Sequence, residues 1–579
     1  MIGFQEVWLR KGMVALTLAC ALVYGLVVPL GEAPDEPGHY NYARILAAEQ
    51  RLPRAEEEHE AFQPPLLYAL AAPLVGLGDV EQLPLLANAD FTLEPGGPSF
   101  LLVHTAAERF PYAGWAAGWH LMRALSAVLA AVTAFACFQT AMLLSGGLPA
   151  AGVIAVAGLA LMPQFSLVHG AATNDSLAVA LGSLLVYRSV GLVRRPARRR
   201  RLLAIGVIWG LAILAKVSLL AAGLGLAAAI WAGRRGRRAW PRVRESVRDL
   251  IALGAGAGIV SGPWFALNTI RYGHPLAWEL VEGTNAVREG AVAWLSDLTG
   301  LYRSYWLSYV GMGLPSWFYV VSLAATVLVL ALALRGWARA GSPALRTSTP
   351  VLLLWALGFF VSWVRWAMAV MGTDQARLLY PAAAALVPLI GSGAALGMGR
   401  RWRDAATPLL TATMLVVNVY GLAEGINPVF PLTRMGDDPT ARSSATVVFD
   451  ERLELVGWRI DDGGEAGDPP RLWAWWRSLR PLPATSWLTV RVLDGQGNLV
   501  SWRRGVPDGG AYAPDCWPAG VVVTGARAIP LPDEVAPGRY RLEAGVQTLG
   551  EDSWWPVTVD GTPSGEFVEL GELLVTGSQ

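Results

Sequence analysis

The feature that most constrains the fold of this chain is its number of apolar segments long enough to cross a lipid bilayer. A membrane-spanning helix needs about 20 mostly apolar residues, and we count about eleven candidates, of which the two around Lys216 are short. They cover residues 12–30, 117–144, 149–168, 174–193, 202–215, 217–232, 248–268, 316–335, 349–370, 377–397 and 406–424. Of the 579 residues, 54% are hydrophobic and 16% are charged, as is typical of a polytopic membrane protein. We therefore expect a polytopic α-helical membrane domain over residues 1–430.

Basic residues indicate how these helices are oriented. Apart from Lys11 and Lys216 all of them are arginines, and they concentrate in loops. The arginine-rich loops lie at residues 194–201, 234–244, 335–339 and 400–403. If the N-terminus is cytoplasmic, every one of these loops falls on the cytoplasmic side, as the positive-inside rule requires. We interpret the first apolar run as an uncleaved helix, because no cleavage pattern closes it. The formal net charge of +1 and this loop placement argue against nucleic-acid binding.

The chain changes character after the last apolar run. From about residue 440 to 579, short alternating segments are separated by Gly, Pro and Asp turns, for example at 471–477, 487–493, 539–546 and 567–575. This pattern predicts an antiparallel β-sandwich, which the predicted topology places outside the cytoplasm. Its nine or so tryptophans could stack on sugar rings, although core packing is the commoner use of such residues. The cysteines Cys20, Cys137 and Cys516 lie far apart, so neither a disulfide framework nor a cysteine metal cluster is indicated.

The stretch G-E-A-P-D-E-P-G-H-Y-N-Y, residues 31–42, follows the first apolar run directly. It sets Asp35 and Glu36 between two prolines, with His39 one helical turn beyond Asp35. In one interpretation the carboxylates supply a general base or metal ligands at the outer membrane face. In the other, Asp35 merely caps the helix that begins near Pro37. A second short helix is expected over residues 62–77, beginning at the doubled proline that follows Gln63.

Further charged and polar residues fall on the same predicted outer face. They are Arg123, Asn174 with Asp175, Lys216, Arg365 and Arg377. A charge at the centre of a membrane helix costs about 2.5–3.5 kcal/mol, so such residues usually face a cavity or a partner. Each of them alone could be snorkelling to the interface, and Arg365 fits that account best. Together they favour an outward pocket for an anionic ligand beside the carboxylate pair.

Seven short motifs occur in one order along residues 5–425. They are A-P-D-E-P-G-H-Y-N-Y, Q-P-P-L-L-Y from Gln63, H-L-M-R-A-L-S from His120, T-N-D-S-L-A from Thr173, G-L-A-I-L-A-K from Gly210, N-T-I-R-Y-G-H-P from Asn268 and D-Q-A-R-L-L-Y-P from Asp374. In these motifs the chain resembles the GT-C superfamily of membrane glycosyltransferases, and more distantly protein O-mannosyltransferases and aminoarabinose transferases. Many relatives have histidine where this chain has Gln63.

The resemblance implies sugar transfer from a polyprenyl-phosphate donor to an extracytoplasmic glycan, lipid or protein acceptor, with inversion at the anomeric carbon. Asp35 would be the general base, and Arg377 with Lys216 would stabilise the departing phosphate. Glu36 and His39 would orient Asp35 or the acceptor. Arg123, Asn174, Asp175, Arg271 and Tyr380 are further candidates for substrate binding. No cofactor is certain, and a divalent metal with Asp35 and His39 or Glu36 as ligands remains open.

Two other functions compete with this one. A transporter or flippase of lipid-linked glycans would also need outward cationic residues, but it should show inverted repeats, and none is convincing in this sequence. A non-catalytic membrane anchor for the β-domain has no need of buried charges. We therefore expect a multi-pass glycosyltransferase of the plasma membrane, with a cytoplasmic N-terminus and an extracytoplasmic β-domain over residues 440–579.

Overall fold

The computed structural model describes residues 4–80, 85–91, 100–236, 238–283, 288, 293–339, 342–429, 443–461, 470–509, 512–532 and 535–575. The chain divides into two compact units. Unit 1 contains residues 1–29, 33–82 and 114–426, and unit 2 contains residues 30–32, 83–113 and 427–579. The predicted boundary between the domains, at residues 430–440, lies outside the described residues.

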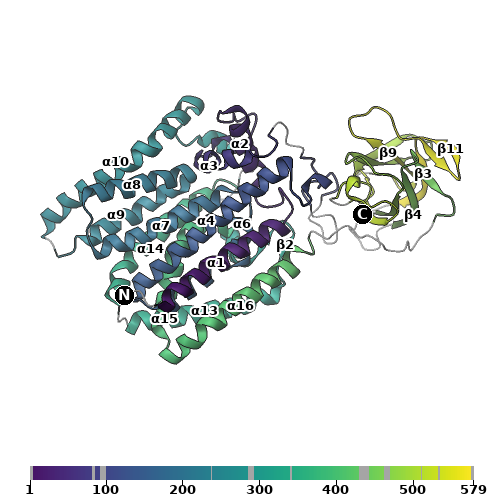
Figure 1. Ribbon diagram of the computed structural model, residues 1–579. Coiled ribbons are helices and arrows are strands. Elements are labelled where there is room, and N and C mark those ends of the chain that lie inside the picture. Colours follow the sequence, from purple (N-terminus) through teal and green to yellow (C-terminus); the bar gives the residue numbers. More distant parts are fainter. Residues whose placement is uncertain are drawn as a thin grey trace. The chain divides into compact units, whose positions relative to one another are not determined.

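Unit 1 is a bundle of long helices that lie side by side (Figure 1). Its longer helices are α1 (Phe4–Val27), α4 (Gly114–Ser145), α7 (Asn174–Arg194), α8 (Arg199–Ala215), α10 (Ala239–Tyr272), α13 (Ser316–Arg339), α14 (Pro343–Ala367), α15 (Tyr380–Gly397) and α16 (Arg400–Tyr420). The shorter ones are α2 (Glu36–Glu49), α3 (Leu66–Val75), α5 (Pro149–Leu159), α6 (Pro163–Gly170), α9 (Ala222–Gly233), α11 (Trp278–Gly283) and α12 (Asp297–Trp306). The helices are connected by short elements. These are the single turns η1 (His59–Phe62), η3 (Val217–Ala221), η4 (Ala293–Ser296) and η5 (Ala376–Leu379), the π-turn η6 (Gly421–Ile426) and the two-residue strands β1 (Ser308–Tyr309) and β2 (Met312–Gly313).

Within the described residues, eight helices are long and apolar enough to cross a membrane. A ninth span results if α5 and α6, which meet at a bend of 68°, are counted as one. The chain is therefore a polytopic helical membrane protein. The prediction of about eleven spans exceeds this count by the two helices on either side of Lys216. There α8 begins with three arginines and ends after 17 residues, because the backbone at Lys216 is extended.

The two short helices after the first span agree with the sequence patterns. Helix α2 begins at Glu36, next to Pro37, and α3 begins at Leu66, directly after the doubled proline. Proline suits a first helical turn because its missing N–H is not needed there. Helices α2 and α3 pack against each other at one end of the bundle, and the start of α1 lies at the other end (Figure 1).

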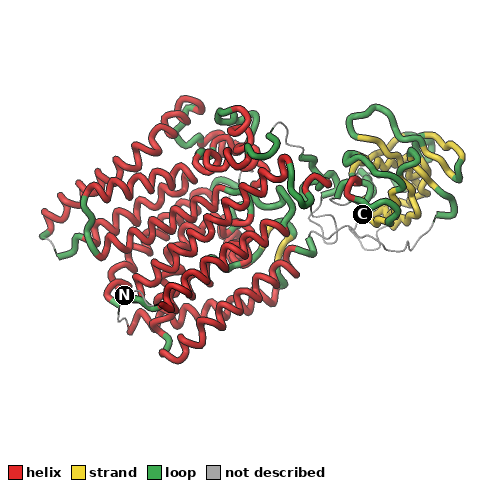
Figure 2. Tube along the Cα trace, viewed as in Figure 1, coloured by secondary structure: helices red, strands yellow, loops and turns green. Residues whose placement is uncertain are grey.

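Unit 2 is a sandwich of two antiparallel sheets (Figure 2). One sheet has the order β11-β10-β3-β4-β5-β8, and the other has the order β12-β9-β6-β7. The strands are β3 (Val447–Phe449), β4 (Leu453–Asp461), β5 (Arg471–Ser478), β6 (Ser486–Leu493), β7 (Leu499–Gly505), β8 (Val522–Ala528), β9 (Gly538–Thr548), β10 (Val557–Val559), β11 (Thr562–Gly565) and β12 (Val568–Val575), with the single turns η2 (Ala106–Glu108) and η7 (Pro514–Cys516). The C-terminal β-domain and its four predicted strands are thus confirmed.

Side chains from both sheets form one apolar core in unit 2. Alternation of buried and exposed positions along β4 is the period-two pattern that a half-buried strand requires. Trp476, Trp517 and Trp555 are buried in this core, which favours the packing interpretation for those tryptophans. Trp502 on β7 is exposed.

A segment from the first long loop also belongs to unit 2. Asp90 accepts hydrogen bonds from the guanidinium of Arg527 at 3.0 and 3.1 Å, and both side chains are buried. His104 lies between Glu32, at 3.1 Å, and Glu108, at 2.8 Å. Removing one member of a buried ion pair is costly, so the Asp90–Arg527 contact ties the loop to the sandwich.

Candidate functional site

Asp35 stands at the start of α2 in an unusual backbone conformation. Its φ of 58° and ψ of 8° lie in the left-handed region, which costs a non-glycine residue about 1–2 kcal/mol. Although Asp35 occupies the cap position, its side chain makes no capping hydrogen bond. The carboxylate instead accepts a hydrogen bond of 2.6 Å from Nη2 of Arg377. Helix capping therefore does not explain this residue, and strained backbone of this kind is often found at functional sites.

Asp35 is the first member of a chain of four charges. Arg377, on η5, also donates from Nη1 to Asp175 at 3.0 Å. Asp175, in the first turn of α7, accepts a further bond of 2.5 Å from the ammonium of Lys216. The chain Asp35–Arg377–Asp175–Lys216 alternates in sign and joins four segments of unit 1 that are far apart in the sequence.

Local sequence places each of these charges at a helix end. The Thr173 hydroxyl accepts a bond from the N–H of Asp175, which caps α7 and fixes Asp175 in its first turn. Lys216 lies at the C-terminal end of α8, where the helix dipole favours a positive charge. Arg377 precedes the Tyr380–Pro381 step that opens α15. The charges thus gather at one end of the bundle without interrupting a helix.

The four side chains differ in their access to solvent. Asp175 and Arg377 are buried, Lys216 is mostly buried, and the Asp35 side chain is 44% exposed. Burial acts to raise the pKa of Asp35, but the positive charge of Arg377 and the nearby His39 and Lys216 lower it, and the pKa lies below its ordinary value. Asp35 is therefore an ionised carboxylate with one side open to a ligand.

Glu36 has a different environment from its neighbour. Its two carboxylate oxygens each accept a bond of 2.6 Å from Arg123, and Oε1 also accepts from the backbone N–H of Ala172 at 2.8 Å. Arg123 donates further to the carbonyls of Gly25, Val28 and Pro29. Because Glu36 is fully buried and Arg123 is 3% exposed, neither is available to a ligand. The structure thus gives Glu36 and Arg123 a structural task, and their catalytic and substrate-binding roles stay predictions from the sequence.

His39 and Asn174 lie close to the chain of charges. The Nδ1 atom of His39 is 2.8 Å from the hydroxyl of Tyr68 on α3. Asn174 donates from Nδ2 to the side-chain oxygen of Gln63 at 3.1 Å. Gln63, which precedes the doubled proline, is therefore a hydrogen-bonding partner of a candidate site residue.

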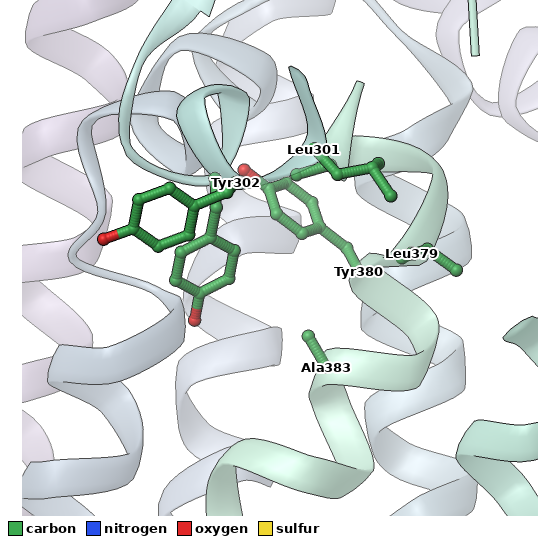
Figure 3. Close-up of a pocket in the computed structure, with 7 residues that line it drawn as sticks. Leu301, Tyr302, Leu379, Tyr380 and Ala383 are labelled. Atoms are coloured by element: carbon green, nitrogen blue, oxygen red, sulfur yellow. The ribbon is translucent and has the colours of Figure 1, made fainter. Parts of the chain in front are cut away.

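Tyr380 lines an apolar cavity of about 260 Å³ (Figure 3). Leu301, Tyr302, Tyr305, Ala376, Leu379 and Ala383 complete its wall. Ala376 and Leu379 belong to the same turn, η5, as Arg377. The Tyr380 hydroxyl is buried and has no hydrogen-bond partner among the described residues.

The structure does not join Arg271 to this network. It is exposed in the last turn of α10, and no hydrogen bond or ion pair links it to the described residues of the chain of charges. Arg271 does act electrostatically on Tyr42 of α2. Burial raises the pKa of Tyr42 above its usual value, and the positive charge of Arg271 makes that rise smaller. Arg365 packs over the ring of Trp278, with 4.9 Å from its guanidinium carbon to the ring centroid, which favours an interfacial role.

Sequence reasoning missed Tyr68 and Glu60. The hydroxyl of Tyr68 bonds His39, and a carboxylate oxygen of Glu60 lies within 4.8 Å of ligand atoms of both Asp35 and His39. The acidic run Glu56–Glu60, which surrounds His59 in a predicted outer loop, was the available signal for Glu60. For Tyr68, the motif Q-P-P-L-L-Y contained the residue without indicating its partner.

Comparison with solved structures finds two crystal structures of ArnT from Cupriavidus metallidurans. The form bound to undecaprenyl phosphate aligns with a TM-score of 0.44 at 16% identity, over 71% of this chain and 69% of ArnT. The apo form aligns with a TM-score of 0.42 at 18% identity, over 71% and 70%. An Archaeoglobus fulgidus oligosaccharyltransferase, in complex with Zn and sulfate, aligns with a TM-score of 0.34 at 11% identity, over 72% of this chain and 52% of that one. No family model and no curated protein matches the chain. The roles proposed below rest on this chain's own residues.

Proposed function

We propose that this protein is an integral-membrane glycosyltransferase that moves a sugar from a polyprenyl-phosphate donor to a hydroxyl of an extracytoplasmic acceptor. The main supporting observation is that a half-exposed carboxylate, Asp35, and a cation, Arg377, meet beside an apolar cavity at one end of a membrane bundle. A polyprenyl-phosphate sugar has three parts that match the apolar cavity, the cation Arg377 and the exposed side of Asp35. Its lipid is apolar, its phosphate is anionic, and its sugar projects toward the solvent-exposed side.

The cavity and Arg377 define the place of the donor. Arg377 lies on the turn whose Ala376 and Leu379 line the cavity, so the phosphate would contact the guanidinium and part of the lipid chain would enter the apolar space. Arginine has five N–H donors, of which three bond Gln375, Asp175 and Asp35. The remaining two, one on each terminal nitrogen, are the ones that the proposal assigns to phosphate oxygens.

In the proposed reaction the acceptor hydroxyl attacks the anomeric carbon of the donor sugar. The new carbon–oxygen bond forms as the bond between that carbon and the phosphate oxygen breaks, and a single displacement inverts the anomeric centre. Asp35 takes the hydroxyl proton, which typically accelerates such a step by about 10²–10⁴-fold. The polyprenyl phosphate keeps the electron pair, and Arg377 and Lys216 stabilise its added negative charge.

The arginine-rich loops support an extracytoplasmic site. Asp175 lies in the first turn of α7 at the charged end of the bundle, and Arg194 ends that helix 19 residues later. At 1.5 Å per residue this separation is about 29 Å, close to the thickness of a bilayer's hydrocarbon core. If the arginine-rich loops are cytoplasmic, Asp35 and its neighbours face the opposite side.

The bent pair α5–α6 is one observation that would suit a transporter, because transporters often contain broken helices. The two functions differ in their product. A glycosyltransferase consumes the polyprenyl-phosphate sugar and releases polyprenyl phosphate, whereas a flippase moves the intact lipid between leaflets.

The test is sugar transfer in membranes that contain the full-length protein, using a panel of radiolabelled polyprenyl-phosphate sugars. Asp35→Asn should reduce release of polyprenyl phosphate by about 10²–10⁴-fold while expression stays normal. Asp404→Asn, an exposed change on α16 next to an arginine-rich loop, is the matched control and should transfer at the wild-type rate. Undiminished transfer by Asp35→Asn would remove Asp35 as the base, and movement of intact donor without release of polyprenyl phosphate would support the flippase.

A further inference from the structure

The outer face of the four-stranded sheet in unit 2 carries aromatic rings and arginines. Alternate residues of β6 enter the apolar core, so the residues between them, such as Thr489 and Arg491, face away from it. The strand register sets Arg504 and Trp502 of β7 opposite Thr489 and Arg491. Trp502 and Arg504 therefore lie on the same outer face, and β7 is an edge strand of its sheet.

Three aromatic rings and two guanidinium groups contact one another here. The guanidinium carbon of Arg504 lies 5.5 Å from the ring centroid of Trp502 and 5.7 Å from that of Trp554. The ring centroids of Trp554 and Phe567 are 4.6 Å apart, and the guanidinium carbon of Arg491 lies 3.3 Å from the centroid of Phe567. We call these five residues the aromatic–arginine cluster. They come from β6, β7, the segment between β9 and β10, and the residue before β12.

Gly545 of β9 allows the ring of Phe567 to lie on the sheet. The register sets Gly545 opposite Thr489, so position 545 belongs to the outer face. A Cβ atom there would stand 2.6 Å from Cε1 of Phe567, closer than real side chains come. A larger residue at this position would therefore lift the ring off the sheet and away from Trp554 and Arg491.

The cluster is accessible to a large ligand. Trp502 is 54% exposed, and Trp554 and Phe567 are partly exposed. Covering an apolar ring removes it from water, which is favourable. A contiguous exposed apolar patch with polar residues around it usually marks an interaction site. Tryptophan and arginine are also among the residues that contribute most to binding at such sites.

The cluster has more positive charge than its neighbouring carboxylate balances. Arg491 donates to Glu543 at 2.8 Å, which pairs that charge. No carboxylate in the described part of the chain pairs with Arg504, whose Nε atom donates to the Thr489 hydroxyl at 3.3 Å. An arginine stacked on aromatic rings keeps the N–H groups of its terminal nitrogens for a planar anion. The charge therefore favours an acidic ligand.

We propose that the aromatic–arginine cluster binds an acidic glycan. The C–H faces of two sugar rings pack on Trp502 and Trp554, and a carboxylate or phosphate group of the glycan accepts hydrogen bonds from Arg504. A sugar ring has an apolar face and a polar edge, so it matches a surface on which aromatic rings lie against arginines. The site is independent of the proposed function, because all of its residues belong to unit 2.

Binding is measured by isothermal titration calorimetry on purified full-length protein, in a detergent whose headgroup is not a sugar. The acidic probes are oligogalacturonate, which carries carboxylates, and phosphomannan oligosaccharides, which carry phosphates. Neutral cello- and manno-oligosaccharides of equal length are compared with them, together with a single-stranded DNA oligonucleotide, because nucleic-acid bases also stack on aromatic rings. We expect at least one acidic glycan to bind about 10-fold or more tighter than its neutral counterpart, with weaker binding at high salt.

Two variants with matched controls test the residues. Trp502→Ala should weaken binding of the acidic glycan by about 5–150-fold, the usual effect of removing an aromatic stacking partner. Arg504→Gln should abolish the preference for acidic over neutral probes. Trp473→Ala and Arg459→Gln make the same changes on the outer face of the six-stranded sheet, where Arg459 lies 5.6 Å from the Trp473 ring centroid, and should bind like the wild type. Thermal unfolding establishes that each variant is folded.

The proposal is overturned if the wild type binds no acidic glycan of the panel, or if the neutral glycans or the oligonucleotide bind as tightly. It is also overturned if Trp502→Ala and Arg504→Gln both bind like their controls. Its failure is distinct from failure of the proposed function. A protein that binds the glycan but transfers no sugar retains this site and loses the function, whereas a protein that transfers sugar but binds no glycan loses only this site.

Discussion

Asp35 and Glu36 are adjacent carboxylates with opposite environments. Asp35 is 44% exposed and bonds Arg377 through one oxygen, whereas Glu36 is fully buried and binds Arg123 through both. Two acidic residues in one motif therefore have different surroundings. We call Asp35–Arg377 the open pair, because Asp35 can meet a ligand, and Glu36–Arg123 the closed pair. The closed pair joins α2 to α4 and, through the carbonyls that Arg123 binds, to the end of α1.

The backbone explains how neighbouring residues come to differ. Asp35 has a positive φ and stands just outside α2, so its side chain points away from the direction that a helical residue would take. Glu36 is the first helical residue and points into the bundle. The difference shows that a strained conformation at one residue can separate a solvent-accessible carboxylate from a buried one.

The largest expected effect comes from breaking the closed pair. Glu36→Gln leaves Arg123 as a buried charge without its partner, which typically costs about 3–5 kcal/mol. We expect a large loss of folded protein in detergent and a lower midpoint of thermal unfolding. Glu49→Gln, the same change at the exposed end of α2, should leave the midpoint near that of the wild type. A Glu36→Gln protein as stable as this control would mean that the closed pair is not structural.

Unit 2 contains a second buried ionic cluster, in which His104 lies between Glu32 and Glu108. Its contribution to the free energy of unfolding depends on pH. Burial acts to lower the pKa of His104, but Glu108 and Glu32 raise it to about 9, above the usual 6.5. The stabilisation is then fully present below about pH 6.5 and is lost as the pH rises through 9. A shift of this size corresponds to about 3 kcal/mol.

The measurement is pulse proteolysis in urea of the full-length protein at several pH values, with peptides from β5 and β6 identified by mass spectrometry. Urea resistance of unit 2 should fall between pH 6.5 and 9, and His104→Gln should remove most of that change. A wild-type protein with constant resistance over this range would show that His104 does not gain a proton on folding.

A smaller effect is expected from weakening the open pair. Arg377→Lys keeps the positive charge but loses the planar fork that reaches both Asp35 and Asp175. We expect transfer to fall by about 10–100-fold, roughly the contribution of 1.4–2.7 kcal/mol to the transition state. Kinetics in membranes with a saturating donor would measure it. If Arg377→Lys instead lowers the unfolding midpoint as much as Glu36→Gln does, the open pair is structural too.

The smallest expected effect is that of Asp35→Asn on stability. Asparagine tolerates the left-handed conformation better than most residues, and the site is half-exposed, so unfolding should change by less than about 1 kcal/mol. Thermal unfolding of the purified variant beside Glu36→Gln measures the contrast directly. Similar losses in the two variants would contradict the separation of roles.

Several features of this protein follow from local sequence. The apolar runs, the start of α3 after the doubled proline and four strands of the sandwich were predicted because length, periodicity and turn residues act on neighbouring positions. The convergence of Asp35, Lys216 and Arg377 was anticipated from helix ends that fall on one predicted face. These inferences need the order of the elements and no knowledge of side-chain contacts.

The tertiary structure decided which of these charges are paired and which stay open. It placed Asp175 between Lys216 and Arg377, enclosed Glu36 with Arg123 and brought Glu60 to the start of α2 across Gly38. Such pairings depend on a side chain's direction and on how closely two segments approach, and neither is encoded by the residues next to it. The amino-acid sequence by itself therefore determined a membrane bundle, a β-sandwich and a charged helix end, and only the folded chain distinguished the available carboxylate from the buried one.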